Sequence, residues 1–184
     1  MKQNLILIGM PASGKSTLGK LLAEKLDMPF LDTDEVLQNT LGEPLQETIN
    51  REGIHSFLQK EAAAVLSIHT EGTVIATGGS VVYSEPAMLH LKSRGLCIFL
   101  SVPFASIASR LQNLETRGVA IPSGKTLLEL YRERSPLYLR YADVIFREDD
   151  CMGDRSIEEH TALLISLLKQ EQHLPSLPHS SSIP

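Results

Sequence analysis

The chain has 184 residues, a length that suits one domain with a sizeable hydrophobic core. Its hydrophobic content of 42% and charged content of 21% are ordinary for a soluble globular protein. The formal net charge of -5 argues against a nucleic-acid-binding surface, which normally carries a basic bias.

The apolar stretches of the sequence are short. The longest, such as residues 5–8 and 97–100, have the length of strands and cannot span a membrane. The first residues lead directly into a glycine-containing loop and do not resemble a signal peptide. Cys97 and Cys151 lack the spacing of metal ligands. We therefore expect a cytoplasmic protein with no membrane partner.

Strand-like runs alternate with amphipathic segments along the chain. Strands are predicted at residues 5–8, 30–31, 73–76, 96–100 and 144–146. Helices are predicted at residues 16–26, 35–41, 45–49, 54–69, 86–94, 103–111, 127–141 and 157–170. This alternation is typical of an α/β three-layer sandwich, with helices on both faces of a parallel sheet of about five strands.

The C-terminal residues have a different composition. Residues 174–184 hold three prolines, four serines and no apolar period, so we expect a disordered tail there. Residues 1–173 are expected to form a single domain. Pro136 lies within the predicted helix at 127–141 and either kinks or divides it.

A glycine-containing loop follows the first predicted strand. Its sequence from Gly9 to Ser16 fits the phosphate-loop pattern G-x-x-x-x-G-K-[ST] without a mismatch. Lys15 is expected to reach the β- and γ-phosphates of ATP, and the Ser16 hydroxyl to bind Mg²⁺. A chance match is the alternative, but the required order of strand, loop and helix is present. The expected phosphate-binding residues are Gly9, Ala12, Ser13, Gly14, Lys15, Ser16 and Thr17.

Four further motifs stand at characteristic spacings from this loop. They are Asp32-x-Asp34, Thr77-Gly78-Gly79, Arg110-Leu111 and Arg134-x-Pro136-Leu137-Tyr138. With the phosphate loop, they make the chain resemble the shikimate kinases over nearly all of residues 5–159. In that family ATP phosphorylates a ring hydroxyl of shikimate, so the resemblance implies a P-loop kinase with a lid, here at approximately residues 112–126.

The resemblance also implies a role for individual residues. Asp34 would hold the acceptor hydroxyl and orient or deprotonate it, and Asp32 would support Mg²⁺ through water. Arg117, from the lid, would neutralise charge on the transferring phosphoryl group. The remaining implied contacts are Arg110 and Arg155 on the nucleotide side, and Gly78, Gly79, Ser80 and Arg134 on the acceptor side. An arginine suits position 134 because its planar guanidinium can pair with a carboxylate through two hydrogen bonds.

Each of these assignments has a simpler structural alternative. Arg110 and Arg117 could be solvated surface charges. Asp32 could be a helix cap. Gly78 and Gly79 could serve a tight turn.

The sequence departs from the family pattern at four places. Leu58 stands where an arginine would bind the shikimate carboxylate, and Ser80 stands where a third glycine is usual. The lid carries Gly118-Val119-Ala120 after Arg117 in place of P-L-L, and Ala12 occupies a position that is commonly glycine. Loss of one of two arginines from a carboxylate clamp should cost about 1.5–3 kcal/mol.

The acceptor is therefore left open between shikimate and another small hydroxy acid such as homoserine. Arg51, Lys60 and Lys125 are the candidates to replace the missing cation. His55 or Ser56 could contribute to an ammonium site, although surface positions on a helix are the better explanation for both. We expect a monomer that takes a small hydroxy-acid substrate and no nucleic acid. A regulatory nucleotide-binding module and a nucleoside monophosphate kinase are the remaining alternatives.

Overall fold

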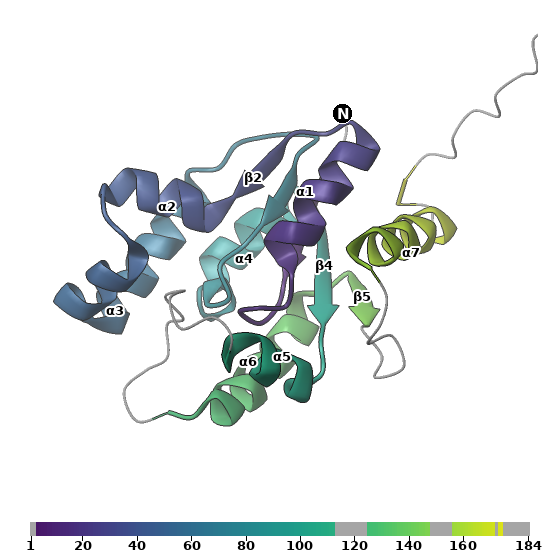
Figure 1. Cartoon of the computed structure of the whole chain (residues 1–184). Coiled ribbons are helices and arrows are strands. Elements are labelled where there is room, and N and C mark those ends of the chain that lie inside the picture. Colours follow the sequence, from purple (N-terminus) through teal and green to yellow (C-terminus); the bar gives the residue numbers. More distant parts are fainter. Residues whose placement is uncertain (1–2, 113–124, 148–155, 172, 175–184) are drawn as a thin grey trace, which may run out of the picture.

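The computed structural model describes residues 3–112, 125–147, 156–171, 173 and 174. Five parallel strands form one sheet in the order β2-β3-β1-β4-β5 (Figure 1). The strands are β1 (Asn4–Ile8), β2 (Phe30–Asp32), β3 (Val74–Ala76), β4 (Gly95–Ser101) and β5 (Val144–Arg147). The predicted parallel sheet of about five strands is confirmed.

Helices cover both faces of this sheet. They are α1 (Lys15–Leu26), α2 (Thr33–Leu41), α3 (Leu45–Leu66), α4 (Glu85–Lys92), α5 (Phe104–Gln112), α6 (Leu127–Tyr141) and α7 (Ile157–Gln170), with a short 3₁₀ helix at Val81–Tyr83. The predicted tail beyond residue 174 and most of the predicted lid, residues 113–124, lie outside the described residues.

The central strand β1 contributes side chains to two hydrophobic clusters, one on each face of the sheet. Its residues are all buried, and successive side chains point to opposite faces. Ile6 and Ile8 pack into a cluster with residues of α3, α4 and α6. Leu5 and Leu7 pack into a second cluster with residues of α1 and α7. Burying each of these side chains contributes about 1.5–3 kcal/mol, so the apolar run holds both helical layers to the sheet.

The strand order determines where a ligand can bind. The chain leaves β1, forms β2 at the edge of the sheet, and returns to place β3 between them. The loops after β1 and β3 therefore lie side by side, and the Thr77 hydroxyl donates a hydrogen bond to the Leu7 carbonyl oxygen at 2.9 Å. A site at the carboxyl ends of parallel strands is the usual outcome of such a topology. In Figure 1 the arrow of β4 points toward this edge, where α5 and α6 lie.

Helix α3 is broken at Gly53. The sequence predicts separate helices at residues 45–49 and 54–69, and the structure has two helical segments that meet at Gly53, the second of which ends at Leu66. Gly53 has φ 82° and ψ 166°, a conformation that favours glycine, so the helical direction changes there. Pro136 does not divide α6, which runs through it to Tyr141.

None of the helices in the described part of the chain is both long enough and apolar enough to cross a membrane.

Candidate active site

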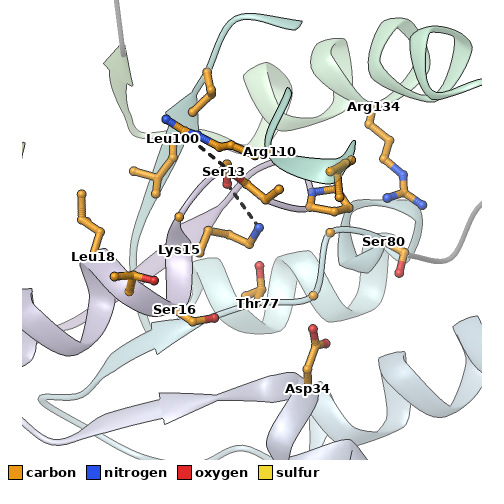
Figure 2. Close-up of a pocket in the computed structure, with 18 of the residues that line it drawn as sticks. Ser13, Lys15, Ser16, Leu18, Asp34, Thr77, Ser80, Leu100, Arg110 and Arg134 are labelled. Atoms are coloured by element: carbon orange, nitrogen blue, oxygen red, sulfur yellow. Dashed lines mark hydrogen bonds between the residues drawn. The ribbon is translucent and has the colours of Figure 1, made fainter. Parts of the chain in front are cut away.

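A cavity of about 540 Å³ lies at the carboxyl ends of the central strands. The phosphate loop forms one wall, and residues 77–80 with Asp34, Glu61 and Arg134 form the other. This volume is ordinary for a site that binds a small molecule. Figure 2 shows Asp34 pointing from α2 toward Lys15 and Thr77, and Arg134 pointing from α6 toward Ser80. The structure thus brings most of the predicted site residues into one cavity.

The phosphate loop turns tightly before α1. Gly14 has φ 89°, a left-handed conformation that lets the backbone amides of the loop and the helix N-terminus face the cavity. Ala12 is also left-handed, with φ 62°. A left-handed alanine costs roughly 1–2 kcal/mol, which explains in physical terms why glycine suits this position.

Lys15 is held beneath the loop. Its Nζ donates hydrogen bonds to the Gly9 carbonyl oxygen at 3.0 Å, the Met10 carbonyl oxygen at 2.7 Å and the Ser13 hydroxyl at 3.3 Å. Burial lowers the pKa of Lys15 to about 8, while the charges of Asp34 and Asp32 raise it. The ammonium is thus mostly charged at neutral pH, and its three donors bind oxygens of the loop.

Asp32 joins the phosphate loop to α2. Its Oδ2 accepts a hydrogen bond from the Ser16 hydroxyl at 2.6 Å, and its Oδ1 caps α2 by accepting from the Asp34 amide at 2.9 Å. The helix cap considered from the sequence is therefore confirmed, and the support of Mg²⁺ by Asp32 stays a prediction. A hydroxyl with a carboxylate behind it suits Mg²⁺, which usually binds one or two protein oxygens together with phosphates and water.

Asp34 lies across the cavity from Lys15. Burial raises the pKa of Asp34 to about 6, the charge of Asp32 raises it further, and Lys15 lowers it. A pKa just below neutral leaves the group mainly as a carboxylate that can still accept a proton, which is what a general base requires.

Glu61 is a functional candidate to which the sequence alone assigned no role. It lies on α3 after the break at Gly53, its residue is only 3% exposed, and its Oε1 has no hydrogen-bond partner among the described residues. Burial raises the pKa of Glu61 to about 7, and Asp34 also raises it, whereas Ser80, Arg134 and Lys15 lower it. The sequence signal that could have found it is the family segment G-x-x-x-F-R-x-x-E, which this chain carries from Gly53 to Glu61 with Leu58 in place of the arginine.

Gly78 has a spatial role. A Cβ atom there would lie 2.2 Å from Glu61 Oε1 and 2.6 Å from Asp34 Oδ1, so both carboxylates approach the same point of the backbone. The Gly78 amide donates to the Thr33 hydroxyl at 3.0 Å. At Gly79 a Cβ atom would meet Pro11 Cδ at 2.8 Å, so the absence of a side chain lets this segment lie against the phosphate loop.

Replacement of Gly78 by alanine should therefore damage the acceptor side of the site and spare the nucleotide side. Because the methyl group displaces two carboxylates from the cavity wall, we expect kcat to fall about 100-fold. Steady-state kinetics and binding of a non-hydrolysable ATP analogue would measure this, with a thermal melt to confirm folding. An equal loss of nucleotide binding would contradict the spatial role.

Arg134 ends the cavity on the acceptor side. It is 1% exposed, its Nε donates to the Tyr83 hydroxyl at 3.2 Å, and its guanidinium lies 5.0 Å from the centre of the Tyr83 ring. A buried guanidinium held in this way is well suited to bind a carboxylate. On the other side, Arg110 donates from α5 to the Ala12 carbonyl oxygen at 3.4 Å and lines the cavity beside the phosphate loop.

Two predicted site residues cannot be placed. Arg117 and Arg155 lie outside the described residues, so their assignments stay predictions.

The three cations expected to replace the missing arginine form ion pairs outside the cavity. Arg51 pairs with Glu43 and Glu52, Lys60 pairs with Glu52, and Lys125 pairs with Glu133. None of the three lines the cavity.

The side chain of Leu58 also turns away from the site. It packs against the apolar cluster of α2 and α3, whereas Phe57 and Leu45 line the cavity. His55 and Ser56 contact Gln59 and Glu52 on the surface of α3, so the surface explanation holds for both. Of the acceptor-side departures among the described residues, only Ser80 contributes to the wall of the cavity.

Comparison with known proteins agrees with this geometry. The shikimate kinase family model matches residues 11–164. Shikimate kinase of Paracidovorax citrulli is 33% identical over 168 residues, which cover 88% of this chain and 91% of that protein. The crystallised shikimate kinase of Acinetobacter baumannii, in complex with shikimate, has a TM-score of 0.82 at 24% identity and covers 94% of this chain and 96% of its own.

A longer relative is matched with similar strength. Human threonine synthase-like 1 is 31% identical over 177 residues, which cover 95% of this chain. The chain spans only 23% of the length of that protein. The family model and the bacterial relative, each covering most of the chain, show that it belongs to the shikimate kinase family.

Proposed function

We propose that the protein is an ATP-dependent kinase that phosphorylates a hydroxyl of a small hydroxy acid, with shikimate as the acceptor that family membership favours. One observation carries the proposal. The Asp34 carboxylate and the Lys15 phosphate loop face each other across a single cavity that ends at the buried guanidinium of Arg134. Donor phosphates, reacting hydroxyl and acceptor carboxylate each have a complementary group there.

The proposed reaction is an in-line displacement. The acceptor oxygen bonds to the γ-phosphorus, its proton passes to Asp34, and the bridging oxygen leaves with ADP. Phosphoryl transfer needs alignment and positive charge more than covalent help. Lys15 and the loop amides supply that charge beside the β- and γ-phosphates, and Arg117 would add to it. Mg²⁺, held through Ser16 with Asp32 behind it, would neutralise the phosphate oxygens.

The structure favours transfer over a purely regulatory role. A switch that only senses nucleotide needs no proton acceptor on the far side of the cavity, yet Asp34 and Glu61 both line that wall. The net charge of -5 supports a small-molecule acceptor over nucleic acid. We infer also that the chain acts as a cytoplasmic monomer and that Arg155 contacts the nucleotide.

An ADP-release assay with purified protein, ATP and Mg²⁺ tests the proposal. Shikimate and other small hydroxy acids are offered as acceptors, and the phosphorylated product is identified by mass spectrometry. Acceptor-dependent ADP release supports the kinase. Nucleotide binding without release for any acceptor would instead favour the regulatory module.

Replacement of Tyr83 by phenylalanine should weaken acceptor binding. The change removes the hydroxyl that accepts from Arg134 but keeps the ring beside the guanidinium. A hydrogen bond to a charged group contributes about 1.5–3 kcal/mol, so we expect the acceptor KM to rise on the order of 10-fold. The KM for ATP should stay the same. Tyr141→Phe, the same change on α6 beyond the cavity, serves as the control, and an equal effect there would refute the role of Tyr83.

A further inference from the structure

The wall of the cavity opposite the phosphate loop carries two carboxylates close together. Glu61 comes from α3 and Asp34 from α2, and Gly78 leaves the space into which both project. Asp34 has a task in the proposed reaction because it faces Lys15 and the reacting hydroxyl. Glu61 has no such task, yet it is buried in the same wall, with only 3% of the residue exposed.

Glu61 is incompletely satisfied by the protein. Its Oε1 is buried and has no hydrogen-bond partner among the described residues. Burial of a carboxylate oxygen without a donor is unfavourable, and a neutral donor offsets that cost less well than a cation. The surface cations that the sequence offered for this region pair with Glu43, Glu52 and Glu133 instead. The charges of Arg134 and Lys15 also act on Glu61, but Oε1 itself is left for a donor that enters the cavity.

The cavity has a partner for each polar group of a molecule that carries a carboxylate, a hydroxyl and a cation. Arg134 offers a guanidinium for a carboxylate, Asp34 accepts from a hydroxyl, and Glu61 awaits a cation. We propose that Glu61 binds a primary ammonium group of the acceptor, so that the substrate class is a small hydroxy amino acid. The inference rests on the proposed kinase function, and it replaces shikimate, which has no ammonium group, by a small hydroxy amino acid as the acceptor. The Ser80 hydroxyl, which lines the same wall and is hydrogen-bonded to Glu61, offers its oxygen as a second acceptor for the ammonium.

The test compares two acceptors that differ only in the ammonium. L-Homoserine and 4-hydroxybutanoate share the carboxylate, the chain length and the terminal hydroxyl, and shikimate is included as the acceptor of the family. We expect kcat/KM for L-homoserine to exceed that for 4-hydroxybutanoate at least about 10-fold, the effect of a charge-assisted hydrogen bond. Equal values for the pair, or turnover of shikimate alone, would overturn the ammonium site and leave the kinase function standing.

A variant locates the effect at Glu61. Glu61→Gln keeps the shape and a carbonyl acceptor but removes the charge, so the KM for L-homoserine should rise 10- to 100-fold and the KM for ATP should not change. Glu47→Gln, an exposed glutamate on the same helix, is the matched control. An unchanged preference in Glu61→Gln would refute the assignment. No ADP release with any acceptor would mean that the proposed function itself has failed, and the wild-type comparison stands even if the variant does not fold.

Discussion

Replacing Lys15 with alanine is expected to abolish measurable phosphoryl transfer. The Lys15 ammonium is buried beneath the phosphate loop, and in the proposed reaction it neutralises charge on the β- and γ-phosphates. Removing one preorganised electrostatic group typically costs 10²- to 10³-fold in kcat, and this lysine also organises the loop that holds the nucleotide. We expect a loss of at least about 10³-fold, measured as ADP release at saturating ATP and acceptor.

Lys20 provides a control on the same helix. It is exposed on α1 and pairs with Glu35 at 3.7 Å, outside the cavity. Lys20→Ala removes an equal charge and should leave kcat within about twofold of wild type, because an exposed ion pair contributes little. Activity of Lys15→Ala within tenfold of wild type would show that the loop does not bind the transferring phosphate as proposed.

Replacing Asp34 with asparagine should stop the chemical step while leaving nucleotide binding intact. The amide can still orient a hydroxyl but cannot take its proton, and general-base catalysis contributes typically 10²- to 10⁴-fold. Asp34 lies across the cavity from the loop (Figure 2), so in the proposed reaction it acts on the acceptor and not on ATP. We therefore expect kcat to fall on the order of 10³-fold with nearly unchanged affinity for an ATP analogue, measured by steady-state kinetics and calorimetry.

The neighbouring acid is the natural comparison. Glu35 follows Asp34 in the first turn of α2 but is exposed to solvent. Glu35→Gln makes the same change of acid to amide and should be close to silent. A parallel loss of turnover and ATP affinity in Asp34→Asn would place that carboxylate on the nucleotide side and refute its role toward the acceptor.

Local features of the site were predictable from the sequence. The phosphate loop is one contiguous segment whose backbone conformation depends on two glycines, so its spacing alone located Lys15 and Ser16. Asp32 and Asp34 follow a strand, and the carboxyl ends of parallel strands share an edge, which predicted their approach to the loop. The helices and strands were likewise predicted well, since each has a clear apolar period or run.

Contacts between segments that are distant in the sequence were harder to predict. Glu61 is on an amphipathic helix, and only the break at Gly53 and the space at Gly78 determine that it is buried in the cavity. The sequence also drew attention to Leu58, whose side chain packs into the apolar cluster of α2 and α3 instead of lining the site. Which face a helical residue presents depends on the direction of its helix, and this was not readable from periodicity across a break.

The sequence by itself determined that the chain has a phosphate loop and a parallel α/β sheet, because these depend on short-range backbone conformation and apolar patterning. The resemblance to a known family added the prediction that Asp34 orients or deprotonates the acceptor hydroxyl. The tertiary structure alone decided the character of the acceptor wall. The surface cations Arg51, Lys60 and Lys125 find carboxylates outside the cavity, whereas Glu61 Oε1 is buried within it and has no partner among the described residues. Charge pairing is a property of distances in space, and the spacing of residues along the chain does not determine it.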